Sequence, residues 1–258
     1  MTAIDVHHRV EGPSDAPVIV LSNSLGTDLR VWEPQAPELS ERFRVVRYDH
    51  RGHGRSPVPA GPYTMADLAG DVIALLDRLG VERASFCGVS MGGMVGMALA
   101  TAAPERVDRL VLCCTSAHMP PPELWDERIA SVTAHGTAAM VDGTIARWFT
   151  ESFRATDPPA VALARDMIGS TPAAGYAACC AAIRDMDQRA TIGAITSPTL
   201  VIAGEHDPAT PPEHGELIRD RIAGSSMEVI PAASHLAVLE RPEAVRAAIR
   251  SHMTKAQI

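Results

Sequence analysis

The position of Ser90 in the sequence suits a hydroxyl that acts as a nucleophile. It lies between a short apolar run, 83–87, and a longer run with helical character, 91–103, at the centre of Gly88-Val89-Ser90-Met91-Gly92. A serine hydroxyl is a weak nucleophile, and a sharp turn between a strand and a helix lifts it to where a base can reach it. The two glycines leave room for that turn. A glycine-rich turn without function is the alternative, and the flanking pattern favours the nucleophile.

Two other residues have the types and positions that a serine nucleophile needs in its partners. His235 follows the β-rich segment 227–230, and Asp207 follows the segment 199–203. If these segments are parallel strands, both side chains lie on loops at the same end of the sheet as Ser90. The chain order is then serine, acid, histidine, as in one known arrangement of a catalytic triad. We predict that His235 is the general base and that Asp207 orients it.

Nearby polar residues receive structural interpretations. Glu205 and His206 are interpreted as solvated loop residues, and the remaining histidines as surface residues. The turn 49–56 is charged, rich in glycine and placed after a predicted strand. Arg51 or His53 in this turn could enter the site. We favour the interpretation that they form hydrogen bonds with loops near its rim.

Acyl transfer also needs hydrogen-bond donors for the oxyanion that forms when a carbonyl is attacked. Loss of one such donor typically costs about 3 kcal/mol of barrier. The backbone N–H of Met91 is one candidate, because it begins a predicted helix and the helix dipole assists it. The other is the backbone N–H of Leu25, in the loop 22–27 that follows the apolar segment 18–21. The Leu25 side chain takes no part in this chemistry.

The segments that hold these residues alternate between β-rich and helical patterns. Amphipathic stretches such as 65–79 and 242–252 lie between continuous apolar runs. This alternation predicts an α/β fold with a mostly parallel, twisted sheet and helices on both faces. Residues 7–10 would add an antiparallel edge strand. The other predicted strands are 17–22, 43–48, 84–87, 107–113, 199–203 and 227–230.

The alternation stops between about residues 116 and 196, where proline clusters interrupt helical stretches. We predict a helical cap over residues 116–196, inserted into a core made of residues 1–115 and 197–258. The cap follows one predicted strand and precedes another. It should therefore arch over the carboxyl ends of the sheet, where open α/β folds place their ligands.

Composition limits the possible partners. With 258 residues, 46% of them hydrophobic and 21% charged, the chain can bury one sizeable core. The formal net charge of −8 and the lack of Lys/Arg clusters argue against nucleic acid as a partner. We also expect no signal peptide and no membrane association, because no apolar run is long enough for either.

The cysteines and histidines predict neither disulfides nor a metal site. The five cysteines include two adjacent pairs, 113–114 and 179–180, which suit neither a disulfide framework nor metal-ligand spacing. We expect reduced, mostly buried thiols in a cytoplasmic protein. No metal or organic cofactor is expected, since His206, Asp207 and His214 are the nearest approach to a ligand cluster. Oligomeric state cannot be predicted from this sequence.

Together these motifs resemble the α/β-hydrolase fold superfamily along the whole chain. The pentapeptide around Ser90, the turn 49–56, Asp207 and His235 match it in order. One departure is Asn23-Ser24, where many members carry a His-Gly pair. A narrower set of motifs looks like the 3-oxoadipate enol-lactonases of aromatic catabolism: the loop 22–27, Trp32, Arg147-Trp148-Phe149, Gly175-Tyr176, Cys179-Cys180 and Ala182-Ile183.

The narrower resemblance implies a function in the β-ketoadipate pathway. A serine hydrolase would open the ring of 3-oxoadipate enol-lactone, a small anionic lactone, through an acyl-enzyme on Ser90. Arg147 is the implied partner of the substrate carboxylate, because a guanidinium matches a carboxylate in two bonds. A surface arginine covering Trp148 is the alternative. Trp148 itself either lines the pocket or packs the cap onto the sheet.

Two other classes of function are compatible with the same residues. A general carboxylesterase, a C–C bond hydrolase or a hydrolase of another small lactone would use the same triad, because fold and triad define the reaction type more firmly than the substrate. A ligand-binding module that keeps the fold without turnover is the alternative outside enzymes. The presence of Ser90, Asp207 and His235 together argues against it.

Overall fold

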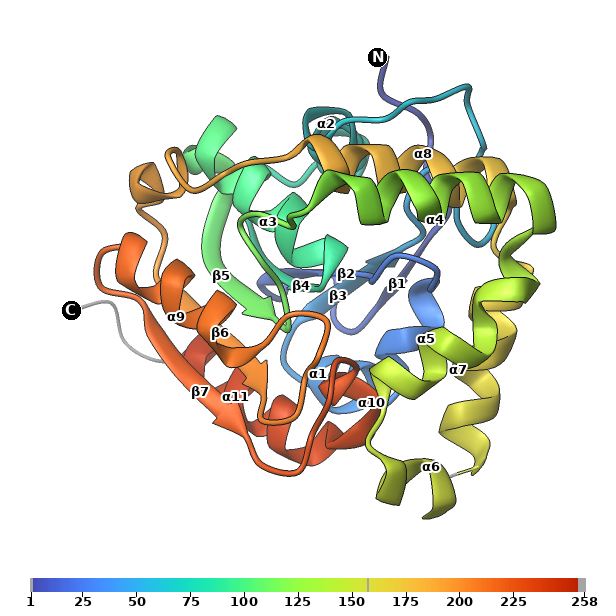
Figure 1. The fold of residues 1–258 in the computed structure, drawn as a ribbon. Helices are drawn as coiled ribbons and strands as arrows, with labels where there is room; N and C mark the ends of the chain where they lie inside the picture. Colours follow the sequence, from blue (N-terminus) through green and yellow to red (C-terminus); the bar gives the residue numbers. More distant parts are fainter. Residues whose placement is uncertain (1, 157, 255–258) are drawn as a thin grey trace.

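A seven-stranded sheet forms the centre of the computed structural model, which describes residues 2–156 and 158–254 (Figure 1). The strand order is β1-β3-β2-β4-β5-β6-β7, with β1 antiparallel to β3 and the other neighbours parallel. The predicted α/β fold is confirmed. The strands are β1 His8–Glu11, β2 Val18–Ser22, β3 Arg44–Tyr48, β4 Ala84–Val89, β5 Val107–Cys113, β6 Thr199–Gly204 and β7 Ser226–Ile230.

The central strands are buried on both faces, which explains their continuous apolar sequences. β4 pairs with β2 on one side and with β5 on the other. All six residues of β4 and all six of β6 are buried. Parallel pairing places the carboxyl ends of these strands at one edge of the sheet. The loops that carry Ser90 and Asp207 therefore leave the sheet at the same edge.

Helices cover both faces, and the core forms two clusters of buried apolar side chains. Neighbouring residues of β5 belong to different clusters, because successive side chains of a strand point to opposite faces. Leu112 belongs to the cluster that includes residues of α2, α3 and α9, and Val111 to the one that includes residues of α1, α10 and α11. These helices are α1 Ala36–Leu39, α2 Met65–Arg78, α3 Met91–Ala102, α9 Pro212–Arg221, α10 Ala237–Glu240 and α11 Pro242–Thr254.

Between β5 and β6 the described chain has helices and one isolated bridge, from His118 to Asp187, but no longer strand. α4 runs alongside α8 (Figure 1). We use the name cap for residues 116–196, and their status as a separate unit stays a prediction. The cap helices are α4 Pro122–His135, α5 Val141–Trp148, α6 Glu151–Thr156, α7 Pro158–Ser170 and α8 Ala173–Asp185. Short 3-10 helices are η1 Leu29–Trp32, η2 Pro104–Arg106, η3 Thr137–Met140 and η4 Ile192–Ala194.

Burial confirms one sequence prediction and corrects another. All five cysteines are free and buried. His50, His53 and His252, in contrast, are at most 5% exposed, so the interpretation of the remaining histidines as surface residues is wrong for these three. Each of their rings has hydrogen-bond partners in the interior, which makes its burial possible. Among the described residues, the helices are all too short or too polar to cross a membrane.

Candidate active site

Ser90 lies between β4 and α3 in a backbone conformation that few residues other than glycine adopt. Its φ is +55° and its ψ is −117°, a strained combination of the kind found at functional sites. A Cβ atom on Gly88 would lie 2.2 Å from the carbonyl carbon of Gly92, and one on Gly92 would lie 2.3 Å from the carbonyl oxygen of Ser22. A larger residue at either position would push the helix and its neighbouring strands apart. The turn therefore requires both glycines.

The structure brings Ser90, His235 and Asp207 together. The Oγ atom of Ser90 lies 2.9 Å from Nε2 of His235. The Nδ1 atom of the same ring lies 2.8 Å from Oδ2 of Asp207. In this geometry the histidine can take the serine proton while the carboxylate holds the ring. All three residues are buried, at 7%, 3% and 3% exposure, which strengthens the electrostatic interactions among them.

Asp207 is fixed by three donors besides His235. Its Oδ1 accepts the N–H groups of Ala209 at 2.8 Å and Thr210 at 3.0 Å. Its Oδ2 accepts the Thr210 hydroxyl at 2.7 Å. Burial by itself raises the pKa of Asp207, but the charge of His235 and the hydrogen bonds from His235 and Thr210 lower it below its ordinary value. Asp207 is therefore anionic at neutral pH and keeps a proton on Nδ1 of His235.

The second predicted oxyanion donor lies on residues 22–29, which we call the oxyanion loop. Leu25 lines the same cavity as Ser90. The N–H of Met91 belongs to the first turn of α3, where N–H groups have no partner within the helix. These positions are compatible with the predicted oxyanion hole, and the roles of the two N–H groups stay a prediction.

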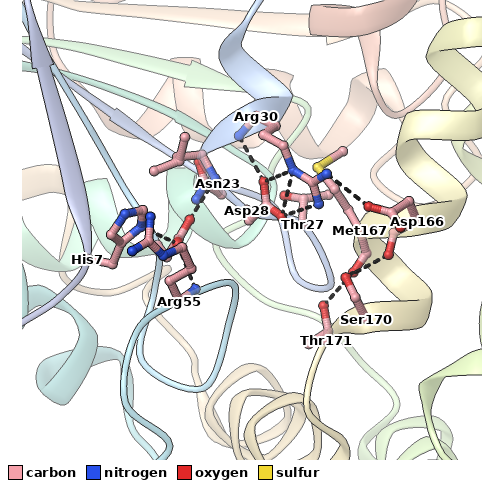
Figure 2. Close-up of polar contacts among 12 residues, drawn as sticks. His7, Asn23, Thr27, Asp28, Arg30, Arg55, Asp166, Met167, Ser170 and Thr171 are labelled. Carbon is pink, nitrogen blue, oxygen red and sulfur yellow. Dashed lines mark hydrogen bonds and ion pairs between the residues drawn. The ribbon is translucent and has the colours of Figure 1, made fainter.

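Hydrogen bonds and ion pairs hold the oxyanion loop from two sides. Asn23 donates through its side chain to the backbone oxygen of Tyr48, at 2.6 Å. Near the other end, Figure 2 shows Arg30 between Asp28 of the loop and Asp166 of α7, with N–O distances of 2.7 and 2.9 Å. Partly exposed ion pairs contribute little stability one by one. These two ion pairs nevertheless connect the oxyanion loop to α7 of the cap.

The turn 49–56 forms hydrogen bonds with the oxyanion loop. The Nε2 atom of His53 accepts the N–H of Gly26 at 2.9 Å, next to Leu25. Arg51 forms a buried ion pair with Asp71, with an N–O distance of 2.6 Å. The favoured structural interpretation of both residues agrees with these contacts. Both side chains are 0% exposed, however, so they lie in the interior and not at a rim.

We expect protonation of His53 to destabilise the fold, because the ring must accept the Gly26 N–H through an unprotonated Nε2. Burial lowers the pKa of His53 from 6.5 to about 4. The unfolded chain therefore binds the proton first as the pH falls. His53 contributes stability above pH 6.5, and about 3 kcal/mol of it is lost as the pH falls toward 4.

Urea unfolding at pH 7.5, 6.0 and 4.5 measures this effect. In His53→Gln the side-chain amide oxygen can still accept the Gly26 N–H, so we expect a shallower loss of stability with falling pH than in the unsubstituted protein. His206→Gln is the matched control, since the His206 side chain is 58% exposed. Equal pH slopes for the unsubstituted protein and His53→Gln would contradict the assignment.

A cavity of about 300 Å³ lies over Ser90 and His235, between the core and the cap. Arg147 and Trp148 both line it, as the implied substrate contacts require. Trp148 is 6% exposed and also packs in the apolar cluster that contains Val111. Trp148 therefore both lines the pocket and packs the cap onto the sheet. The remaining walls are largely apolar, with the side chains of Leu25, Met94, Met119, Leu124, Trp125 and Ile183.

Two arginines of the cap face this cavity without a counter-ion. The Arg128 guanidinium lies 4.9 Å from the ring centroid of Trp125, and the Arg147 guanidinium donates to the Thr144 hydroxyl at 3.4 Å. Over residues 2–156 and 158–254, neither arginine forms an ion pair with a carboxylate. Burial lowers the pKa of Arg147, and the neighbouring charge of Arg128 lowers it further. An anionic ligand in the cavity would relieve this repulsion.

Comparison with known proteins places the chain in a family. A family model described as the alpha/beta hydrolase fold matches residues 17–242. The chain belongs to the α/β-hydrolase fold family. Its sequence is 37% identical to 3-oxoadipate enol-lactonase 2 of Acinetobacter baylyi over 257 residues, which cover 99% of this chain and 96% of that protein.

Other proteins similar to this α/β-hydrolase include a second enol-lactonase and a putative carbamate hydrolase. The crystal structure of the enol-lactonase from Burkholderia xenovorans LB400 superposes with a TM-score of 0.96 at 42% identity, over 98% of this chain and 97% of that one. A putative carbamate hydrolase RutD from Variovorax paradoxus is 34% identical over 239 residues, or 89% of each chain. These similarities identify the protein as a hydrolase.

Sequence reasoning missed two residues that line the candidate site of this α/β-hydrolase. Arg128 lies three residues after Trp125 on α4, a spacing that places both on one side of a helix, and this was an available signal. Thr210 lies three residues after Asp207, within reach of a local hydrogen bond to its carboxylate. Within the described residues, no cluster of three or more His, Cys, Asp or Glu side chains could hold a metal ion.

Proposed function

We propose that this α/β-hydrolase opens the lactone ring of 3-oxoadipate enol-lactone to give 3-oxoadipate. The observation that carries the proposal is one cavity that holds Ser90 and His235 together with Arg128 and Arg147, two arginines without an ion-pair partner in the described part of the chain. The serine and histidine supply acyl-transfer chemistry. The arginines supply the positive charge that a lactone with a carboxylate requires in a protein of net charge −8.

The reaction begins when Ser90 Oγ attacks the lactone carbonyl and His235 takes its proton. Asp207 stabilises the imidazolium that forms, and the N–H groups of Leu25 and Met91 receive the oxyanion. Collapse of the tetrahedral intermediate breaks the ring C–O bond and releases an enolate oxygen, which leaves more readily than an alkoxide. His235 protonates this oxygen, and ketonisation of the enol draws the reaction forward. Water activated by His235 then cleaves the acyl-enzyme.

The carboxylate of the substrate lies away from the lactone carbonyl, and the cavity offers positively charged side chains in addition to the serine and histidine. Ser90 and His235 line one part of its wall, and the cap contributes Arg128 and Arg147. A guanidinium can bind a carboxylate through two parallel hydrogen bonds. We therefore extend the predicted clamp from Arg147 alone to the pair, with Trp148 as an apolar wall beside it.

The clamp predicts a difference between anionic and neutral substrates. Arg147→Ala and Arg128→Ala should each raise KM for the enol-lactone about 10- to 100-fold, because a hydrogen bond to a charged group contributes about 1.5–3 kcal/mol. KM for a neutral ester such as p-nitrophenyl acetate should change little. Steady-state kinetics on both substrates measure this split, with Arg165→Ala as control, since Arg165 pairs with Asp142 on the exposed surface.

Two outcomes would contradict this assignment. Equal losses on both substrates would make the arginines structural. Comparable kcat/KM of the unsubstituted protein on the enol-lactone and on simple esters would refute the lactonase and favour a general carboxylesterase. A carbamate is the second candidate substrate, because of the likeness to the putative carbamate hydrolase, and should be assayed beside them.

A further inference from the structure

Glu240 is a buried carboxylate that joins the histidine loop to the cap. It is the last residue of α10 and is 2% exposed. Its Oε2 atom accepts the backbone N–H of Ser234, the residue before His235, at 2.7 Å. Its Oε1 atom accepts the backbone N–H of Thr150 at 3.0 Å and also the Thr150 hydroxyl. One side chain thus contacts the segment of the general base and the segment that follows Trp148.

Two direct hydrogen bonds connect the same segments. The Ser234 hydroxyl donates to the backbone oxygen of Arg147 at 2.9 Å. The N–H of Leu236 donates to the backbone oxygen of Trp148 at 3.0 Å. Both chain neighbours of His235 are therefore bonded to cap residues that line the cavity, Ser234 to Arg147 and Leu236 to Trp148. The position of the base and the position of the cap wall depend on each other.

The Glu240 carboxylate is held by hydrogen bonds and not by a cation. In the described part of the chain its carboxylate forms no ion pair with lysine, arginine or histidine. A buried carboxylate is costly unless donors satisfy its oxygens, and Ser234 and Thr150 supply them. Glutamine at this position keeps the shape but turns one acceptor into an NH2 group. That group would face a backbone N–H donor, so either the Ser234 N–H or the Thr150 N–H would lose its acceptor.

We propose that Glu240 is a positioning residue that couples the cap segment 147–150 to His235. Through Ser234 it holds Nε2 of His235 at its 2.9 Å distance from Ser90 Oγ. Through Thr150 it holds the backbone that carries Arg147 and Trp148 over the cavity. The coupling to a bound carboxylate rests on the proposed function, whereas the alignment of His235 applies to any ester.

Steady-state kinetics of Glu240→Gln test the proposal, with active sites counted by titration with a fluorophosphonate. Misplacement of a catalytic group by about 1 Å can cost about 100-fold in rate. We therefore expect kcat per active site to fall about 10- to 100-fold on both the enol-lactone and p-nitrophenyl acetate. KM should rise several-fold for the anionic lactone only. Glu243→Gln, an exposed glutamate of the next helix, is the matched control and should retain both constants.

A second variant distinguishes a loss of the coupling from misfolding of Glu240→Gln. Thr150→Val removes the hydroxyl bond to Glu240 but keeps the backbone N–H, and it should shift the same constants in the same direction by a smaller factor. If Glu240→Gln and Thr150→Val change only the melting temperature or the number of titrated sites, the coupling is overturned. Failure of the unsubstituted enzyme on the enol-lactone would refute the proposed substrate alone, because the ester assay still measures the alignment of His235.

Discussion

Replacement of Ser90 by alanine should lower kcat on the enol-lactone by about 10⁵- to 10⁶-fold. The variant lacks the hydroxyl that lies 2.9 Å from Nε2 of His235, and losses of this size follow removal of the nucleophile from other serine hydrolases. The fold should persist, because the Ser90 hydroxyl bonds only to His235 among the described residues. Alanine and serine also meet the same strain at a φ of +55°.

Intact-mass spectrometry gives this prediction a second measurement. The unsubstituted enzyme should gain one equivalent of a fluorophosphonate, and Ser90→Ala should gain none. Ser251→Ala, an exposed serine of α11, should react like the unsubstituted enzyme. Activity of Ser90→Ala above about one per cent would dismiss the turn after β4 as the site. Labelling without any turnover on esters or lactones would instead support a binding module with a vestigial triad.

Asp207→Asn should lower kcat by about 10⁴-fold, as for the equivalent change in a serine protease. Asparagine fits the space of Asp207, but its NH2 group would donate to Nδ1 of His235. The ring would then carry its proton on Nε2, which faces Ser90, and could not accept the serine proton. The loss should appear in kcat, while binding of the lactone by Arg128 and Arg147 is retained.

Glu205→Gln is the matched control for Asp207→Asn. Glu205 lies in the same loop but is exposed, and its carboxylate contacts the backbone N–H of Ala232 and the ring of His206 and no triad residue among those described. Its loss should leave kcat within about two-fold, as for an ordinary surface position. If Glu205→Gln lowered kcat as much as Asp207→Asn, the acid of the triad would be misassigned. An unchanged fluorophosphonate rate in Asp207→Asn would likewise exclude a role in activating Ser90.

The sheet could be predicted because each central strand carries a local signal. β4 and β6 are buried on both faces, so their sequences are continuous apolar runs that need no knowledge of their neighbours. The turn at Ser90 is equally local, since Gly88 and Gly92 are required by contacts within a few residues of the serine and with β2. Chain order along a parallel sheet then predicted Asp207 and His235.

The buried histidines were mispredicted for a different reason. His53 lies in a turn of mostly polar residues, and such turns are usually at the surface. Its burial depends on a contact with Gly26, which is 27 residues away in the sequence. The same holds for Arg51 and its ion pair with Asp71. Side chains whose partners come from another element leave no periodic pattern that a single sequence could reveal.

The sequence by itself thus determined the parallel sheet, the strained turn at Ser90 and the order of the three triad residues. The reason is that the burial of a strand and the geometry of a turn depend on residues that are close together in the chain. Only the tertiary structure decided that Arg128 joins Arg147 over the cavity, and that Glu240 connects His235 to the cap. Glu240 and Thr150 are 90 positions apart in the chain, and Arg128 and Arg147 belong to different helices. Both arrangements depend on how the cap helices pack over the sheet, which no local pattern encodes.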